Sequence, residues 1–107
     1  MKYASSQFHL QFIYSFTKAE EIMKELYICE LKALLSKQLL QYRRRHKLTQ
    51  AQLAERLMID PRSYIELEHG KSLCGTLVLL MYLSYCCEDI PALLAQIKAC
   101  LEKADSA

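Results

Sequence analysis

The feature that most limits the fold of this 107-residue chain is its shortage of helix breakers. It holds only two glycines and two prolines, and none of the four precedes Pro61. The runs between them are rich in Leu, Ala, Lys, Glu and Gln, which are strong helix formers. The sequence therefore predicts an all-α fold with short connections. A hydrophobic content of 52% supplies enough material for one core, so we expect a single domain.

Residues 1–16 differ from the rest of the chain. In FHLQFIYSF, aromatic and apolar side chains alternate with others, which is the period of a half-buried strand. A lone strand needs a partner, so one alternative is an arm that pairs with its copy in a second subunit. The other alternative is a disordered leader, with Met23 as the start of translation. We therefore predict an N-terminal extension over 1–16 and a single helical domain over 17–107.

Helix signals begin at Thr17, which has Glu20 at the spacing of a capping box. One long helix or two abutting helices are predicted for about 18–46. The apolar positions recur at three- and four-residue steps, first at Ile22, Leu26, Cys29 and Ala33, and later, on the expected inward face, at Leu35, Leu39 and Tyr42.

Two short helices are predicted in LTQAQLAERLMIDPRSYIELEHGK, residues 48–71. Thr49 is a favourable N-cap for the first helix. Asp60 followed by Pro61 starts the second, because the carboxylate accepts a bond from a first-turn N–H and proline is tolerated where no donor is needed. Gly70 is a typical residue to end that helix. The pattern is therefore helix, short turn, helix.

An apolar run of 15 residues, LCGTLVLLMYLSYCC, occupies 73–87. A membrane span needs about 20 residues, so we expect no membrane association. A helix that is apolar all round is expected to be buried on several sides. After it, IPALLAQIKACLEKA predicts a final amphipathic surface helix.

Positive charge is concentrated in one part of the chain. Residues 32–72 contain nine Lys/Arg against four Asp/Glu, a net charge of +5, whereas the whole chain carries only +2. Such a segment is typical of a polyanion-binding surface, although solvated helix faces can look similar.

The five cysteines are odd in number, contain no CxxC pair and follow no signal peptide. Reduced, mostly buried thiols in a cytoplasmic protein are the simplest interpretation. The three histidines have no metal-ligand spacing relative to the cysteines, so we expect no metal and no cofactor. No catalytic constellation is present either, which argues against an enzyme.

The segment from Leu34 to Lys71 resembles the helix-turn-helix domain of lambda-repressor/Cro-like, or XRE-type, transcriptional regulators. The matching marks are Thr49-Gln50, Leu53-Ala54, Leu57, Ile59 and Leu67-Glu68-x-Gly70-Lys71. The resemblance implies a lambda-repressor-like bundle of about five helices, with the helix-turn-helix at 49–69 and the N-terminal extension outside it.

The resemblance also implies roles for individual residues. The base-contact candidates are Arg62, Ser63 and Glu66, of which Arg62 is the best donor because guanidinium can bind guanine with two hydrogen bonds. The phosphate-contact candidates are Gln50, Arg44, Arg45, Lys47 and Lys71. Arg43 and Glu68 occupy the positions of a buried ion pair whose role is structural.

Three residues depart from the family pattern. Met58 stands where glycine with positive φ is usual, so the turn is expected to be strained or to follow a different path. Pro61 cannot read a base edge by hydrogen bonding. Glu66 could accept from cytosine, but an acid near phosphates is otherwise repelled.

The implied function is a cytoplasmic, sequence-specific regulator that binds double-stranded DNA, at a short palindromic operator, as a homodimer, with no small-molecule ligand. The dimer-interface candidates are Leu79, Tyr82 and Tyr85, since they extend the apolar surface of 73–87 beyond the needs of a small core. Packing of that surface against residues 1–30 is the alternative. The alternative function is a protein–protein interaction module that binds a partner regulator or a toxin.

Overall fold

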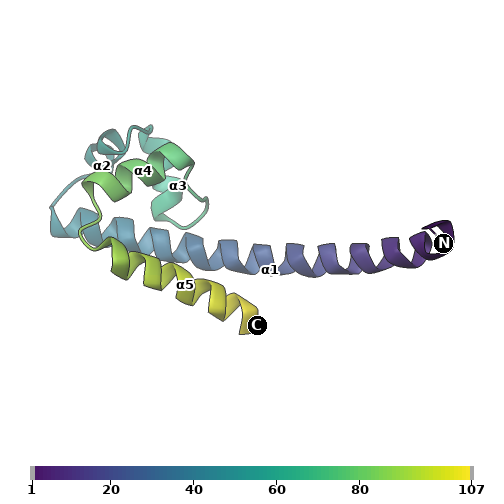
Figure 1. The fold of residues 1–107 in the computed structure, drawn as a ribbon. Helices are drawn as coiled ribbons and strands as arrows, with labels where there is room; N and C mark the ends of the chain where they lie inside the picture. Colours follow the sequence, from purple (N-terminus) through teal and green to yellow (C-terminus); the bar gives the residue numbers. More distant parts are fainter. Residues whose placement is uncertain (1, 107) are drawn as a thin grey trace.

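A computed structural model of the protein describes the backbone of residues 2–106 and the side chains of residues 18–105. The described chain consists of α1 (Lys2–Arg45), α2 (Gln50–Arg56), α3 (Pro61–Glu68), α4 (Thr76–Tyr85) and α5 (Ile90–Ser106), with no strand in this range. The helices α2, α3 and α4 gather beside the C-terminal part of α1, and α5 runs next to it (Figure 1). The predicted all-α fold of five helices is confirmed.

The N-terminal segment differs from the sequence prediction. Residues 2–16 belong to α1, so the strand-like arm, one of the two alternatives for this segment, is wrong. A single strand would leave its backbone N–H and C=O groups unpaired, whereas a helix pairs them internally. Thr17 consequently lies inside α1 and does not begin it. The side chains of residues 1–17 are outside the described ones, and the division of the chain at residue 16 stays a prediction.

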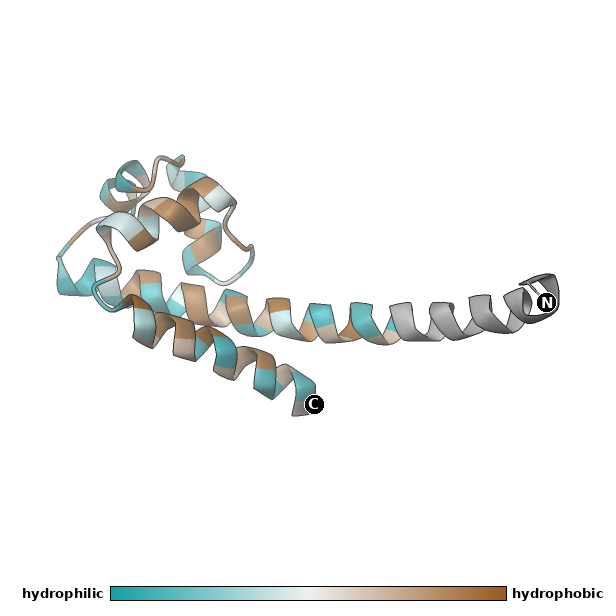
Figure 2. Ribbon diagram, viewed as in Figure 1, coloured by the Kyte–Doolittle hydropathy of each residue, from teal (hydrophilic) through white to brown (hydrophobic). Residues whose placement is uncertain are grey.

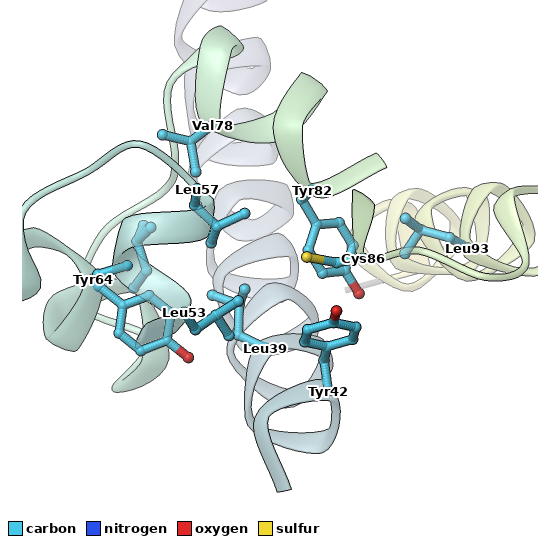
Figure 3. Close-up of a cluster of buried hydrophobic side chains, with 11 residues drawn as sticks. Leu39, Tyr42, Leu53, Leu57, Tyr64, Val78, Tyr82, Cys86 and Leu93 are labelled. Atoms are coloured by element: carbon cyan, nitrogen blue, oxygen red, sulfur yellow. The ribbon is translucent and has the colours of Figure 1, made fainter. Parts of the chain in front are cut away.

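The core forms where α1, α2, α3 and α4 meet the start of α5. Figure 3 shows its side chains converging from all five helices: Leu39, Tyr42, Leu53, Leu57, Tyr64, Val78, Tyr82, Cys86 and Leu93. Leu39, Leu53, Leu57 and Tyr64 are fully buried. Each such leucine contributes about 1.5–3 kcal/mol by leaving water. The inward face predicted for the second half of α1 is thus confirmed at Leu39 and Tyr42 and is partly buried at Leu35.

Helix α4 is buried on one side only, which differs from the expectation for 73–87. Val78 and Tyr82 enter the core, but Leu77, Leu80 and Tyr85 are exposed. Figure 2 shows the helix as hydrophobic along most of its length. The described helices around α4 cover only one of its faces, so several of its apolar side chains stay exposed.

Polar side chains join α4 and α5 to α1. The Tyr82 hydroxyl donates to Oε1 of Gln38 at 2.9 Å, and Nε2 of Gln38 donates to Oε1 of Gln96 at 2.9 Å. Near the far end of α5, Lys103 pairs with Glu30 at 3.4 Å. These bonds fix α5 along α1 on the side away from the helix-turn-helix.

Candidate nucleic-acid interface

Both short helices begin with the caps that the sequence predicts. The Thr49 hydroxyl accepts from the Gln52 N–H at 3.1 Å, and Oε1 of Gln52 accepts from the Thr49 N–H at 2.9 Å. At the start of α3, Asp60 accepts from the backbone N–H and the hydroxyl of Ser63 at 3.0 and 2.7 Å. These bonds satisfy N–H groups that no helical carbonyl can reach. The two short helices expected in this segment are found as α2 and α3.

In the turn between α2 and α3, Met58 has the positive φ that glycine usually adopts. Met58 has φ of 61°, and its side chain is 64% exposed. A side chain in this left-handed region costs roughly 1–2 kcal/mol. Strain at Met58, one of the two alternatives that the sequence leaves open, is therefore what the structure has.

Arg43 and Glu68 form the ion pair that the resemblance implies. Nε of Arg43 donates to Oε2 of Glu68 at 2.9 Å, and Nη2 donates to Oε1 at 2.7 Å. Burial, the largest single influence, would raise the pKa of Glu68, but the hydrogen bonds and positive charge of Arg43, together with the other polar neighbours, outweigh it and hold this pKa below its usual range. Nη1 of Arg43 also donates to the Leu48 carbonyl at 3.3 Å. The pair thereby fixes α3 and the segment before α2 to α1.

Gln50 lies beside this pair. Its Nε2 donates to Oε1 of Glu68 at 3.4 Å, and the side chain is partly exposed at the start of α2. One amide N–H of Gln50 is therefore directed inward, and its second remains available. The sequence prediction for Gln50 did not include this contact, because it depends on a carboxylate 18 residues away.

Tyr64 occupies the buried side of α3. Its ring is fully buried, and its hydroxyl has no hydrogen-bond partner among the described residues. Burial and the nearby carboxylate of Glu68 raise the pKa of Tyr64 far above its ordinary value. Tyr64 therefore stays neutral and packs α3 against the core.

The opposite side of α3 is open to solvent. Pro61, Arg62, Ser63 and Glu66 are all exposed, and their contact with DNA bases stays a prediction. The Ser63 hydroxyl donates its hydrogen bond to Oδ1 of Asp60, so toward a ligand it can act only as an acceptor. Asp60 also belongs to this exposed side, although the sequence analysis treats it only as a cap. The two hydrogen bonds from Ser63 lower the pKa of Asp60, so this carboxylate adds a negative charge at the exposed start of α3.

The phosphate-contact candidates do not all lie together. Lys47 follows the end of α1 with φ of 55°, Lys71 follows α3, and both are exposed. Arg44 is exposed at the end of α1. Arg45 points elsewhere, because its guanidinium pairs with Glu88, next to α5, at 3.6 Å. The described geometry thus places Arg45 beside an acid and apart from α3.

The three dimer-interface candidates differ in their exposure. Leu79 and Tyr85 are exposed, with Tyr85 at 68%. Tyr82 is only 4% exposed, and its hydroxyl is bonded to Gln38, so it belongs to the core and offers no area to a partner. The expectation for Tyr82 is therefore wrong. Leu79 and Tyr85 remain predicted interface residues.

Other kinds of site find no support among the described residues. No group of three or more His, Cys, Asp or Glu side chains is placed to bind a metal ion there. All five cysteines are free. Within the same part of the chain, no helix has an apolar stretch long enough to span a membrane.

Comparison with known proteins agrees with this geometry. The helix-turn-helix family model matches residues 39–74, from the buried part of α1 to the segment after α3. No curated protein and no solved structure matches the chain. Residues 39–74 are therefore similar to the helix-turn-helix family of the lambda-repressor/Cro-like, XRE type.

Proposed function

We propose that the protein is a cytoplasmic, non-enzymatic transcriptional regulator that binds a short palindromic DNA operator as a homodimer. The observation that carries the proposal is the arrangement of α3 within the matched domain. Its inner side is fixed to α1 by the Arg43–Glu68 pair, and its N-terminal turn presents Arg62 to solvent. A recognition helix needs both a fixed orientation and an exposed first turn.

Arg62 is the proposed base-reading residue. It is exposed in the first turn of α3, where side chains of a recognition helix meet base edges in the major groove. A guanidinium can donate two parallel hydrogen bonds to O6 and N7 of guanine. Pro61 beside it contributes shape only, since it has no N–H.

Phosphate contacts are proposed for Gln50, Lys47, Lys71 and Arg44. Gln50 lies at the N-terminus of α2, where free N–H groups also favour an anion. The three basic residues are exposed near the ends of α1 and α3. Contacts of this kind set affinity and position, and they carry no sequence information themselves.

The acids on the reading face limit the affinity of one domain. Asp60 and Glu66 are exposed near Arg62 and would be repelled by phosphates, while Glu66 can accept from cytosine N4. A single domain should therefore bind weakly and selectively. Two linked domains on a palindromic operator would combine their binding free energies, so the affinity of the pair far exceeds that of one domain, which is the physical reason for proposing a dimer.

The test is a titration of labelled duplex DNA at several salt concentrations. We expect the logarithm of affinity to fall steeply with the logarithm of salt, because each phosphate contact releases a counterion. Lys71→Ala should reduce that slope by about one and weaken binding to all duplexes similarly. Lys98→Ala removes the same charge from the exposed surface of α5 and is the matched control, with no expected change.

A selection of bound sequences from a random duplex pool then tests the palindrome. A regulator of this kind should enrich two inverted half-sites with centres about one DNA turn apart. Failure to bind any duplex at about 50 mM salt, where phosphate contacts are strong, would contradict the proposed function.

A further inference from the structure

Helix α1 carries a second apolar stripe that faces away from the core. Ile22, Leu26, Cys29 and Ala33 follow one another at steps of four, three and four residues, the spacing of a coiled-coil seam. Ile22 is 54% and Leu26 39% exposed, and Cys29 and Ala33 are exposed as well. At 3.6 residues per turn, this outer stripe lies roughly a third of a turn from the core-facing Leu39.

No other described helix covers the outer stripe. Helix α5 packs along a different side of α1, where Gln38 contacts Gln96 and Glu30 pairs with Lys103. Helix α3 ends against Ser36, whose hydroxyl donates to the Glu68 carbonyl, and a Cβ added at Gly70 would lie 3.8 Å from the Ser36 Cβ. The N-terminal part of α1 extends beyond both neighbours (Figure 1).

We propose that the outer stripe binds the same stripe of a second copy of this chain, with the two α1 helices antiparallel. In this register Ile22 lies opposite Ala33 of the other copy, and Leu26 lies opposite its Cys29. Each layer then joins one large and one small side chain, which fills the seam evenly. Parallel pairing would place Ala33 opposite Ala33 and leave a gap there.

The flanking charges favour the same direction. Glu25 and Lys32 lie one position before Leu26 and Ala33 and border the stripe on one side. In the antiparallel register Glu25 of each copy faces Lys32 of the other, so two opposite-charge pairs form. A parallel pair in register would bring Glu25 near Glu30 of the other copy and Lys32 near its Lys37, which repel.

This pairing would also set the distance between the two recognition helices, a consequence that rests on the proposed function. The two-fold axis passes between Leu26 and Cys29, about 12 residues from the level at which Ser36 and Arg43 bind α3. At 1.5 Å per residue this is about 18 Å, so the two α3 helices lie about 36 Å apart along the pair. Half-sites one DNA turn apart require about 34–36 Å.

The two α3 helices would also face the same way. Ser36 and Arg43, which hold α3, lie roughly a sixth of a turn to one side of the outer stripe. A two-fold rotation about an axis perpendicular to the helices keeps both contacts on the same side of the pair. The α5 helices lie on the other side and leave the reading faces free.

The first experiment measures self-association without DNA by sedimentation equilibrium. We expect the full chain to be a dimer, and Leu26→Glu to weaken the dimer by roughly 30-fold or more, as at a buried interface centre. Lys24→Glu introduces the same residue on the opposite face of α1 and should leave the dimer intact. Circular dichroism confirms that each variant is folded. A monomeric wild-type chain, or a dimeric Leu26→Glu variant, would overturn the proposal.

The second experiment establishes the direction of pairing. Glu25→Lys and Lys32→Glu should each weaken self-association, because each puts like charges opposite one another. Mixing the two variants should restore association, since the mixed pair again has opposite charges at both contacts. Stronger self-association of Glu25→Lys alone would indicate parallel pairing and overturn the antiparallel arrangement.

The two proposals fail in different ways. If the α1 pairing is wrong, the wild-type chain sediments as a monomer but still binds duplex DNA. Absence of duplex binding would leave the sedimentation results unchanged. A Leu26→Glu variant that is monomeric should still bind an isolated half-site with wild-type salt dependence, because its helix-turn-helix is intact.

Discussion

The two sides of α3 differ in what limits their residues: the inner side must pack against the core, and the outer side is exposed to solvent. On the inner side, Tyr64, Leu67 and Glu68 are buried, and the geometry of Glu68 depends on a residue of α1. On the outer side, Arg62 and Glu66 are exposed and are not part of the core. The inner side determines where α3 lies, and the outer side determines what it can contact. The outer residues can therefore change with little effect on the fold.

The largest expected effect is on the inner side. Glu68→Gln removes one charge of a largely buried pair and leaves Arg43 without its partner, so the free energy of unfolding should fall by about 3 kcal/mol. Glu66→Gln makes the same change on the outer side of α3 and should change it by less than about 0.5 kcal/mol. Urea unfolding measures both. Equal effects would remove the contrast between the two sides.

Lowering the pH should reveal how much the Arg43–Glu68 pair contributes to stability. The folded-state pKa of Glu68 lies below its unfolded value, so its contribution to stability is present above about pH 4.3 and is lost as pH falls through the folded-state pKa. Stability measured from pH 7 to pH 2 should fall less steeply in Glu68→Gln than in wild type over the acidic part. Parallel curves would show that Glu68 contributes no linkage.

On the outer side, Arg62→Ala should reduce discrimination between sequences. We expect about 2 kcal/mol less preference for the selected operator over a scrambled duplex, with unchanged unfolding free energy. Glu66→Gln should strengthen binding to scrambled duplexes, since it removes a charge that repels phosphate. Fluorescence anisotropy at one salt concentration gives both values. Uniform weakening of all sequences by Arg62→Ala would identify it as a phosphate contact.

The smallest expected effect belongs to the turn that joins the two helices. Met58→Gly should stabilise the protein by about 1 kcal/mol, because glycine adopts φ of 61° without steric cost. Part of the gain is offset by the greater freedom of glycine in the unfolded chain. Met58→Ala keeps a Cβ and should give no such gain. Thermal unfolding distinguishes them, and destabilisation by glycine would mean that the Met58 side chain contributes contacts.

The helix-turn-helix could be predicted because its signals are local. Thr49, Asp60 and Gly70 cap or end helices through bonds within a few residues, and Leu53 and Leu57 repeat at helical spacing. The Arg43–Glu68 pair could be predicted only from the resemblance. Its partners are 25 residues apart, and no local rule brings them together.

The errors arose where the pattern permits more than one structure. The alternation in residues 8–16 fits a strand, but a strand there has no described partner, and the structure continues α1 through it. In α4 nearly every residue is apolar, so periodicity could not select Tyr82 as buried and Tyr85 as exposed. The sequence does not point to the negative charge of Asp60 at the exposed start of α3 as a feature of this surface, because the role of Asp60 as a cap already accounts for it.

If Gln50 binds a DNA phosphate as proposed, its contact with Glu68 has a consequence for that binding. With one amide N–H held by the carboxylate at 3.4 Å, the side chain loses rotational freedom when the protein folds and need not lose it again on meeting DNA. The negative charge of Glu68 is already balanced by Arg43, so it does not repel the arriving phosphate strongly. A bond within the folded protein would thus also orient a hydrogen-bond donor for the proposed phosphate contact.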